Sequence, residues 1–304
     1  MKKRIFTLLL CLVLALSLPG YAQMAAQGYD TQGLDRFSSF ALDESTGEWS
    51  VSDPTFEALL DAVAAEEGKN AMKDGFAVFQ LRLSGNEQTG TLRPEIEINF
   101  FASEPIGVRA VSLLAGGKRF DVNAQAQSIS AGGVRGERVV LPMRLADDLE
   151  LIAGAEEITL VLYGETDVYR TEISATEKAR NARERLEKAS LGCFDLLETL
   201  ESFHVDSYDL WDRSWSEWNA ALDYDLYYSS YAAESIELIT LKDRGEDVEK
   251  LQQLLIAAGF YVGEEEYEFK EKTAEAVARA QEYYGMVVTG AADEGLISCL
   301  QGGD

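Results

Sequence analysis

The sequence predicts a multidomain α+β protein with an N-terminal antiparallel β-sandwich-like domain, a helical connector and a C-terminal three-helix bundle. Three observations support this prediction. Apolar residues alternate at period two in short segments up to residue 174, charged residues then follow without Gly or Pro, and three short amphipathic stretches separated by glycines end the chain. We therefore expect four parts, at residues 1–26, 27–174, 175–235 and 236–304.

Residues 1–26 have the features of a secretory signal peptide in the usual order. Residues 2–4 are basic, an apolar run continues to Leu18, and small residues then predict cleavage after Ala22 or Ala26. The apolar run is shorter than the roughly 20 residues that span a bilayer. We expect an exported protein without a stable membrane span after cleavage.

The β-rich part contains seven segments whose apolar residues alternate or form short buried runs. They are Phe76–Leu83, Glu95–Ala102, Val108–Leu114, Lys118–Asn123, Arg138–Leu145, Glu157–Gly164 and Val168–Ile173. Gly116-Gly117 between two of them predicts a tight hairpin, because glycine adopts positive φ readily. Helices are expected over 53–68 and 147–153. Few helices among many strands indicate a sandwich or curled sheet.

The part from 175 to 235 predicts a helical connector rich in aromatic residues. Its first half is highly charged and lacks Gly and Pro. Aromatic residues then recur at helical spacing, at Trp211, Trp215, Trp218, Tyr224, Tyr227, Tyr228 and Tyr231. Such a stripe either stacks on sugar rings or packs against the rest of the protein, and packing is the more common role.

The C-terminal part predicts three short helices that share a small core. The first has an apolar face at Val248, Leu251, Leu254 and Leu255 and ends at Gly259; the second has one at Ala274, Val277, Ala278 and Gln281 and ends at Gly285; the third presents Leu296, Ile297 and Leu300.

This part resembles the three-helix peptidoglycan-binding domain family over residues 239–301. The matching positions are Gly245, Asp247, Val248, Leu251, Gln252, Leu255, Gly259, Phe269, Thr273, Ala276, Val277, Gln281, Gly285, Thr289, Gly290, Asp293 and Leu300. The resemblance implies that peptidoglycan, either a glycan strand or a stem peptide, is the partner, and that the protein is secreted and associated with the cell wall. Lys242 stands where the family often has a glycine, and Lys270 replaces a helix-capping Asp.

Seven side chains of this part are candidate ligand-binding groups, expected to be exposed around a groove. They are Arg244, Gln252, Tyr261, Tyr267, Thr273, Gln281 and Tyr284. Tyrosines stack on sugar faces, and Gln amides hydrogen-bond peptide carbonyls. Each of the seven could equally be an ordinary surface residue.

The acidic composition restricts the partners. The formal net charge is −26, and it becomes −29 once the basic residues 2–4 are removed. A field of this sign repels phosphates, which argues against nucleic acids as partners. The mature chain's only histidine is His204, so a His-rich zinc site is excluded, and neither a metal nor a cofactor is expected.

No catalytic residue is predicted. Cys193 and His204 lie eleven positions apart, but Cys193 falls on an apolar helix face, where a thiol is inert. It either pairs with Cys299 in a disulfide or stays buried as a thiol. Ser-x-x-Lys and Gly-x-Ser-x-Gly are absent from the mature chain. Glu234-Ser235 resembles the Glu-Ser pair of lytic transglycosylases, without their downstream glycine-rich motifs.

Three hypotheses follow. The first is a secreted, non-catalytic bacterial cell-envelope protein that binds peptidoglycan through its C-terminal domain and presents the β-rich domain to a second partner, such as an envelope protein. The second is a carboxylate-based cell-wall hydrolase with a C-terminal targeting domain. The third is a protein–protein interaction module that has lost wall binding.

Overall fold

The computed structural model describes residues 41–52, 75–86, 88, 91–131, 134–142, 148, 151–152, 154–174, 228–263 and 266–302. The expected signal peptide, the helix over 53–68, Cys193 and most of the expected connector lie outside these ranges, so those expectations stay predictions. Among the described residues, no helix is both long enough and apolar enough to cross a bilayer.

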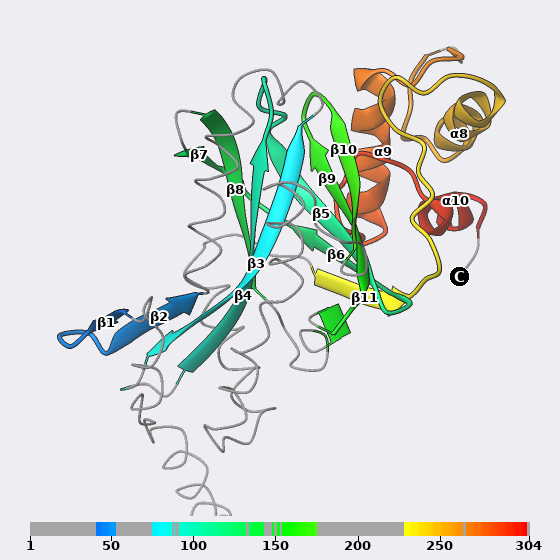
Figure 1. Ribbon diagram of the computed structural model, residues 1–304. Helices are drawn as coiled ribbons and strands as arrows, with labels where there is room; N and C mark the ends of the chain where they lie inside the picture. Colours follow the sequence, from blue (N-terminus) through cyan, green and yellow to red (C-terminus); the bar gives the residue numbers. More distant parts are fainter. Residues whose placement is uncertain are drawn as a thin grey trace, which may run out of the picture.

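The N-terminal part folds into two antiparallel sheets (Figure 1). One has six strands in the order β1-β2-β3-β4-β8-β7, with bounds Ala41–Asp43, Glu48–Ser52, Phe76–Asn86, Thr91–Phe101, Val134–Pro142 and Gln127–Ala131 respectively. The other has five in the order β10-β9-β5-β6-β11, with bounds Val168–Ser174, Glu157–Gly164, Val108–Ala115, Lys118–Asn123 and Tyr228–Ala232. The predicted class of antiparallel β-sheets followed by a three-helix domain is confirmed.

All seven predicted strands exist, and two of them, β6 and β9, have the predicted bounds. The prediction of helix is wrong for Tyr228–Ala232, which form β11 and pair antiparallel with β6. Residues 228 and 231 therefore lie on opposite faces of a strand instead of on one face of a helix. Tyr228 packs against the core between the sheets, and the Tyr231 hydroxyl reaches Asp121 of β6.

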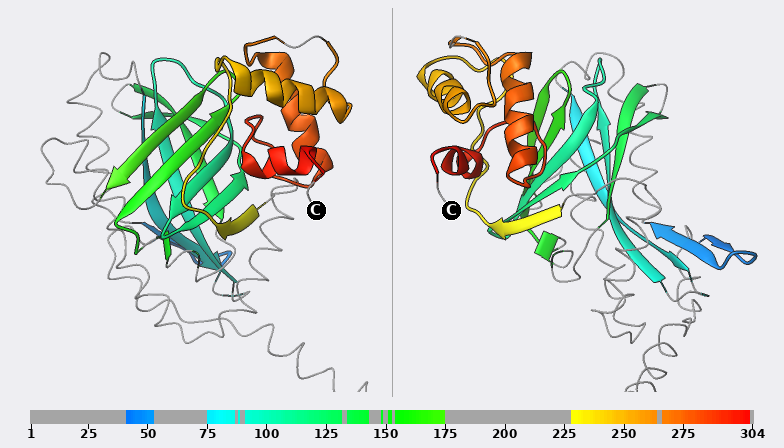
Figure 2. Two further views of the ribbon diagram at one scale, coloured as in Figure 1. Left: turned by 90° about the vertical axis from the view of Figure 1, so that its right-hand side faces the viewer. Right: turned by 180° about the vertical axis from the view of Figure 1, so that it is seen from behind.

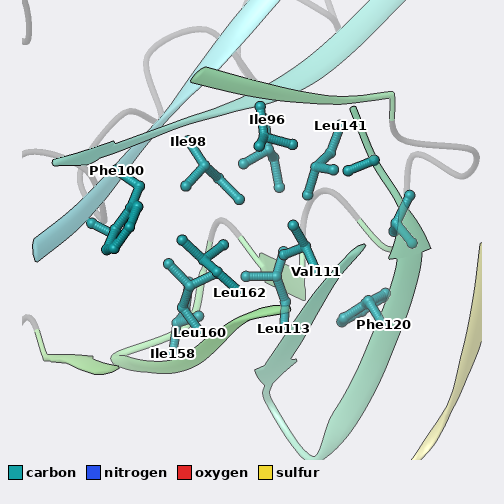
Figure 3. Close-up of a cluster of buried hydrophobic side chains, with 14 of the residues drawn as sticks. Ile96, Ile98, Phe100, Val111, Leu113, Phe120, Leu141, Ile158, Leu160 and Leu162 are labelled. Atoms are coloured by element: carbon teal, nitrogen blue, oxygen red, sulfur yellow. The ribbon is translucent and has the colours of Figure 1, made fainter. Parts of the chain in front are cut away.

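Alternation along the strands places one apolar face of each sheet against the other. Figure 3 shows the resulting core, in which Ile96, Ile98, Phe100 and Leu141 of the six-stranded sheet face Val111, Leu113, Phe120, Ile158, Leu160 and Leu162 of the five-stranded sheet. All ten are at most 2% exposed. Burying each such side chain contributes about 1.5–3 kcal/mol, so this layer provides much of the driving force for folding.

The hairpin between β5 and β6 has the predicted glycine turn. Gly116 and Gly117 have φ of 57° and 76°, the left-handed region that a two-residue type I′ hairpin requires at both positions. A Cβ at Gly116 would also lie 2.6 Å from Cδ1 of Leu151. The turn therefore needs glycine at this position both for its conformation and for the available space.

The C-terminal part contains the three predicted helices, α8 (Glu246–Ala257), α9 (Glu271–Tyr283) and α10 (Glu294–Leu300). Their apolar faces form a separate core of Val248, Leu251, Leu255, Tyr261, Phe269, Ala274, Ala276, Val277, Ala280, Ala292 and Leu296. Gly259 and Gly285 follow α8 and α9 with φ of 82° and 67°, as expected for glycines that end helices.

The central strands of the five-stranded sheet are buried on both faces. Its inner face meets the other sheet, and its outer face meets the C-terminal part (Figure 2). Ala110, Val161 and Tyr163 of this outer face form a cluster with Ile236, Val287 and Ala291. Double burial explains why β9, with sequence EITLVLYG, is almost continuously apolar instead of alternating.

Candidate functional site

The loop between α9 and α10, residues 284–293, docks the C-terminal part onto the outer face of the five-stranded sheet. Val288 N donates to Asn123 Oδ1 at 3.2 Å, and Arg109 Nη2 donates to Thr289 O at 3.4 Å. Gly290 has a φ of 71°, and a Cβ there would overlap the Arg109 guanidinium. The loop therefore fits the sheet through backbone groups and a glycine.

A buried ion network joins the two parts at the same place. Arg119 of β6 lies between two carboxylates, with its Nε 2.8 Å from Asp121 Oδ1 and its Nη2 3.0 Å from Asp293 Oδ2. Asp293 is also the N-cap of α10, because its Oδ1 accepts from Leu296 N at 2.9 Å. One guanidinium thus connects the sheet to the first turn of a helix.

Hydroxyl groups complete the surroundings of Asp121. Its carboxylate accepts from Ser112 Oγ and, at 2.8 Å, from Tyr231 Oη. Burial, followed by the charge of Asp121, raises the pKa of Tyr231 above its ordinary value. Burial likewise raises the pKa of Tyr163, whose Oη lies 3.0 Å from Ser112 Oγ. Both phenols therefore stay protonated at neutral pH.

The Arg119 guanidinium is charged despite its burial. Desolvation acts to lower its pKa, but Asp121 and the neighbouring groups more than offset this and hold the pKa above its ordinary value. The side chains of Arg119, Asp121 and Asp293 are 6%, 7% and 9% exposed. Two carboxylates and one guanidinium leave this network with an excess of negative charge.

A cavity of about 770 Å³ lies beside this network. Its lining comes from β6 (Arg119, Asp121), β11 and the segment after it (Ser229, Tyr231, Ala232, Ala233, Glu234, Ser235, Glu237), α9 and the loop after it (Gln281, Tyr284, Gly285, Met286, Val287, Thr289), and α10 with its cap (Asp293, Glu294, Gly295, Ser298, Cys299). Its volume lies within the roughly 300–1,000 Å³ typical of small-ligand sites. Both parts of the protein build it.

Comparison with known proteins identifies the helical part. Residues 244–300 match the model of a family described as "Putative peptidoglycan binding domain". This region is a peptidoglycan-binding domain. A solved structure, "The crystal structure of SleB N-terminal domain", matches 23% of this chain and 96% of its own at 34% identity, with a TM-score of 0.21. No curated protein matches the chain.

Two predicted departures from the family pattern have structural consequences. Lys242 has a φ of 75°, so it occupies a left-handed position that suits the glycine expected there. Its Nζ lies 2.6 Å from Asp167 Oδ2 in the turn between β9 and β10. Lys270 is the N-cap of α9 and makes no side-chain cap hydrogen bond, as predicted.

Four of the seven candidate residues are buried and a fifth, Tyr284, is half-buried against the helical core, contrary to expectation. Gln252 is 0% exposed, Thr273 1%, Gln281 2% and Tyr261 6%. Tyr261 belongs to the helical core. Gln252 Nε2 donates to Thr273 Oγ1 at 3.0 Å. These side chains are buried because each packs or hydrogen-bonds inside the domain.

The two glutamines hold loops with their amides. Gln252 Oε1 accepts from Glu266 N at 2.7 Å, and its Nε2 donates to Glu268 O at 3.2 Å. Gln281 Oε1 accepts from the backbone N of Thr289 and Gly290 at 3.0 and 2.9 Å. Each amide thus satisfies backbone groups that a regular helix or strand would otherwise satisfy.

The seven candidate ligand-binding residues do not gather around one groove. Gln281 and Tyr284 line the cavity. Arg244 and Tyr267 are exposed near the starts of α8 and α9, where Arg244 Nε and Nη2 donate to Glu268 Oε1 at 3.1 and 2.5 Å. The ligand-binding role of all seven stays a prediction. Among described residues, no group of three potential metal ligands comes together.

The sequence reasoning missed the β-sheet half of the site. Arg119 and Asp121 are two positions apart on β6, where they alternate with the buried Phe120 and Val122. Two charged residues on one face of a buried strand indicate that this face meets another polar surface. That signal was present in the segment KRFDVN, but it does not reveal which segment supplies the opposing charge.

Proposed function

We propose that the chain is an exported, non-catalytic bacterial cell-envelope protein that binds peptidoglycan through residues 236–304. The observation that carries this proposal is the family match at residues 244–300 together with the three-helix fold of that region. The signal-peptide features of residues 1–26 support export. The β-rich part holds the peptidoglycan-binding domain in a fixed orientation, which we call its carrier role, and it contacts a second envelope component.

The carrier role is supported by the contacts at the junction. The peptidoglycan-binding domain is fixed against the five-stranded sheet by the hydrogen bonds from Arg109 Nη2 to Thr289 O and from Val288 N to Asn123 Oδ1. The ion pair between Arg119 and Asp293 and the shared burial of Val287 add to them. A domain held in this way has a defined orientation relative to the sandwich. Binding to the wall would therefore also orient the six-stranded sheet.

The absence of known hydrolase motifs from the sequence supports the non-catalytic part of the proposal. The carboxylate-based hydrolase remains the second candidate because Glu234 lines the cavity, next to the network of Asp121 and Asp293. Glu234 itself is exposed.

Co-sedimentation with purified peptidoglycan sacculi tests the binding. The mature chain, residues 27–304, is the protein to use, because separating residues 236–304 would uncover Ile236, Val287 and Ala291. We expect the mature chain in the pellet and its displacement by excess soluble peptidoglycan fragments. Protein that stays wholly in the supernatant would refute wall binding and favour the protein–protein interaction module.

Turbidity of a sacculus suspension tests the hydrolase alternative. We expect no clearing by the mature chain over hours. Clearing that disappears in the Glu234→Gln variant would replace the non-catalytic proposal with a glycosidase that uses this carboxylate.

A further inference from the structure

We propose that the cavity between β11 and the helices α9 and α10 binds a peptide of the peptidoglycan stem through a free amine of that peptide. This inference rests on the proposed function, and it names the part of the polymer that is recognised and the place where it binds. The site is composite, because the β-rich part and the peptidoglycan-binding domain each supply about half of its walls.

The geometry favours a ligand of peptide size. The cavity holds about 770 Å³, and its inner wall is fixed by the network of Arg119, Asp121 and Asp293. These three side chains are at most 9% exposed and paired with one another, so the wall is preorganised. Preorganisation lowers the entropic cost of binding.

The charges favour a cation. Among the described lining residues, Arg119 is the sole basic side chain, and both of its ends are already bound to carboxylates. Glu234, Glu237 and Glu294 add three exposed carboxylates, none of which forms an ion pair with another described residue. An amine that enters the cavity meets a negative potential, because the basic side chain of the described lining is already paired with two carboxylates.

The remaining groups favour a peptide over a bare amine. Ser229, Ser235 and Ser298 place hydroxyls on the lining, and hydroxyls both donate to and accept from amide groups. Met286 and Val287 supply apolar surface for small alkyl side chains. Stem peptides of peptidoglycan combine amide bonds, methyl-sized side chains and, at the cross-linking residue, an amine.

The outer face of the β6–β11 pair forms one wall of the cavity. Ser229 and Tyr231 of β11 lie opposite Asp121 and Arg119 of β6, and all four residues line the cavity. Because alternate residues of a strand share a face, this wall presents hydroxyl and charged groups together to a bound peptide.

The direct test is calorimetric titration of the mature chain with two soluble stem peptides. One keeps the free amine on its diamino acid, and the other carries an acetyl group on that nitrogen. We expect the free-amine peptide to bind at least tenfold more tightly. Equal affinity for the two peptides, or no binding of either, overturns the assignment.

Variants locate the binding. Glu234→Gln with Glu237→Gln should weaken binding of the free-amine peptide about tenfold, while Glu275→Gln with Glu282→Gln, exposed carboxylates on α9 outside the cavity, should change it less than twofold. Ser298→Trp should block binding sterically. Unchanged far-UV circular dichroism identifies folded variants. Similar losses of peptide affinity in the two double variants would show that the cavity is not the binding site.

Sacculus co-sedimentation separates this inference from the proposed function. If the mature chain and the Glu234→Gln, Glu237→Gln variant both sediment with sacculi and bind the peptide equally, wall binding stands and the cavity is wrong. If the wild-type chain neither sediments nor binds the peptide, both fail.

Discussion

Replacing Arg119 by Met should destabilise the protein far more than replacing an exposed arginine. Methionine retains much of the length and apolar volume of the arginine stem, so the main change is the loss of the charge and its hydrogen bonds. Arg119 bridges Asp121 and Asp293 at 2.8 and 3.0 Å inside the junction. Its removal leaves two carboxylates that are both less than 10% exposed without their cation.

The expected cost is about 3 kcal/mol of the free energy of unfolding. Removing one partner of a buried pair costs about 3–5 kcal/mol, because a buried charge is left uncompensated. The lower end applies here for two reasons. Asp121 keeps hydroxyl donors from Ser112 and Tyr231, and Asp293 keeps the backbone N of Leu296.

Urea unfolding of the mature chain measures the effect, with Arg244→Met as the matched control. Arg244 also pairs with a carboxylate, but its side chain is 72% exposed, and exposed pairs contribute about 0–1 kcal/mol. Near-UV and far-UV circular dichroism should give the same midpoint if the two parts unfold together. Equal losses for Arg119→Met and Arg244→Met would refute the buried-network reasoning.

Four further measurements test other parts of the structure. Lys242→Gly should be more stable than Lys242→Ala by about 1 kcal/mol, since both lose the Asp167 pair and differ in the Cβ at a φ of 75°; thermal unfolding that ranks them equally would contradict this. Lys270→Ser should raise the free energy of unfolding by about 0.5–1 kcal/mol by capping α9, and a lower urea midpoint than wild type would show the reverse. Gln252→Ala should cost about 2–4 kcal/mol, because the variant loses three hydrogen bonds and leaves a backbone N–H unsatisfied; a loss below 1 kcal/mol would mean that the loop does not depend on this amide. The hydrogen bond from Arg244 lowers the pKa of the Glu268 carboxyl below 4.5. The stability that this bond contributes is therefore complete above pH 4.5 and is lost as the pH falls through the lowered pKa. An acid titration followed by NMR should show a higher Glu268 pKa in the Arg244→Met variant.

Local patterns were sufficient to predict the strands and helices that bury one regular face. The alternation in β4 and the glycine pair at 116–117 each specify a conformation through nearby residues alone, and the structure has both. The apolar run of β9 was also recognised as a strand. Its second buried face, however, became evident only once the peptidoglycan-binding domain was seen packed against it.

The sequence predicted the wrong secondary structure at β11 because the spacing of its tyrosines suits a helix. Tyr224, Tyr227, Tyr228 and Tyr231 have the spacing of one helical face, and that spacing predicted a helix. In the structure, pairing with β6 decides the conformation of residues 228–232. The pairing joins segments more than 100 positions apart, so no local pattern could reveal it.

The cavity could not be predicted for a similar reason. Arg119 and Asp121 come from one strand, Glu234 from the segment after another, and Asp293 from a helix cap. These charged side chains meet at one cavity, but the segments that carry them lie too far apart in the sequence to form a recognisable motif. What the sequence did contain was one matching family position, Asp293, whose role as an ion-pair partner depends on Arg119.

The buried glutamines show what two matching family positions do within the fold. Gln252 and Gln281 match family positions, and the side-chain amide of each hydrogen-bonds to the backbone of a neighbouring loop. A side chain whose donors and acceptors are already satisfied has little left to offer a ligand. In the proposed site, recognition would come from residues outside the family pattern. In this chain such residues include Glu234 and Tyr231, which the β-rich part contributes beside α9 and α10. If the proposed site binds the stem peptide, the β-rich part sets the ligand preference while the helical core remains unchanged.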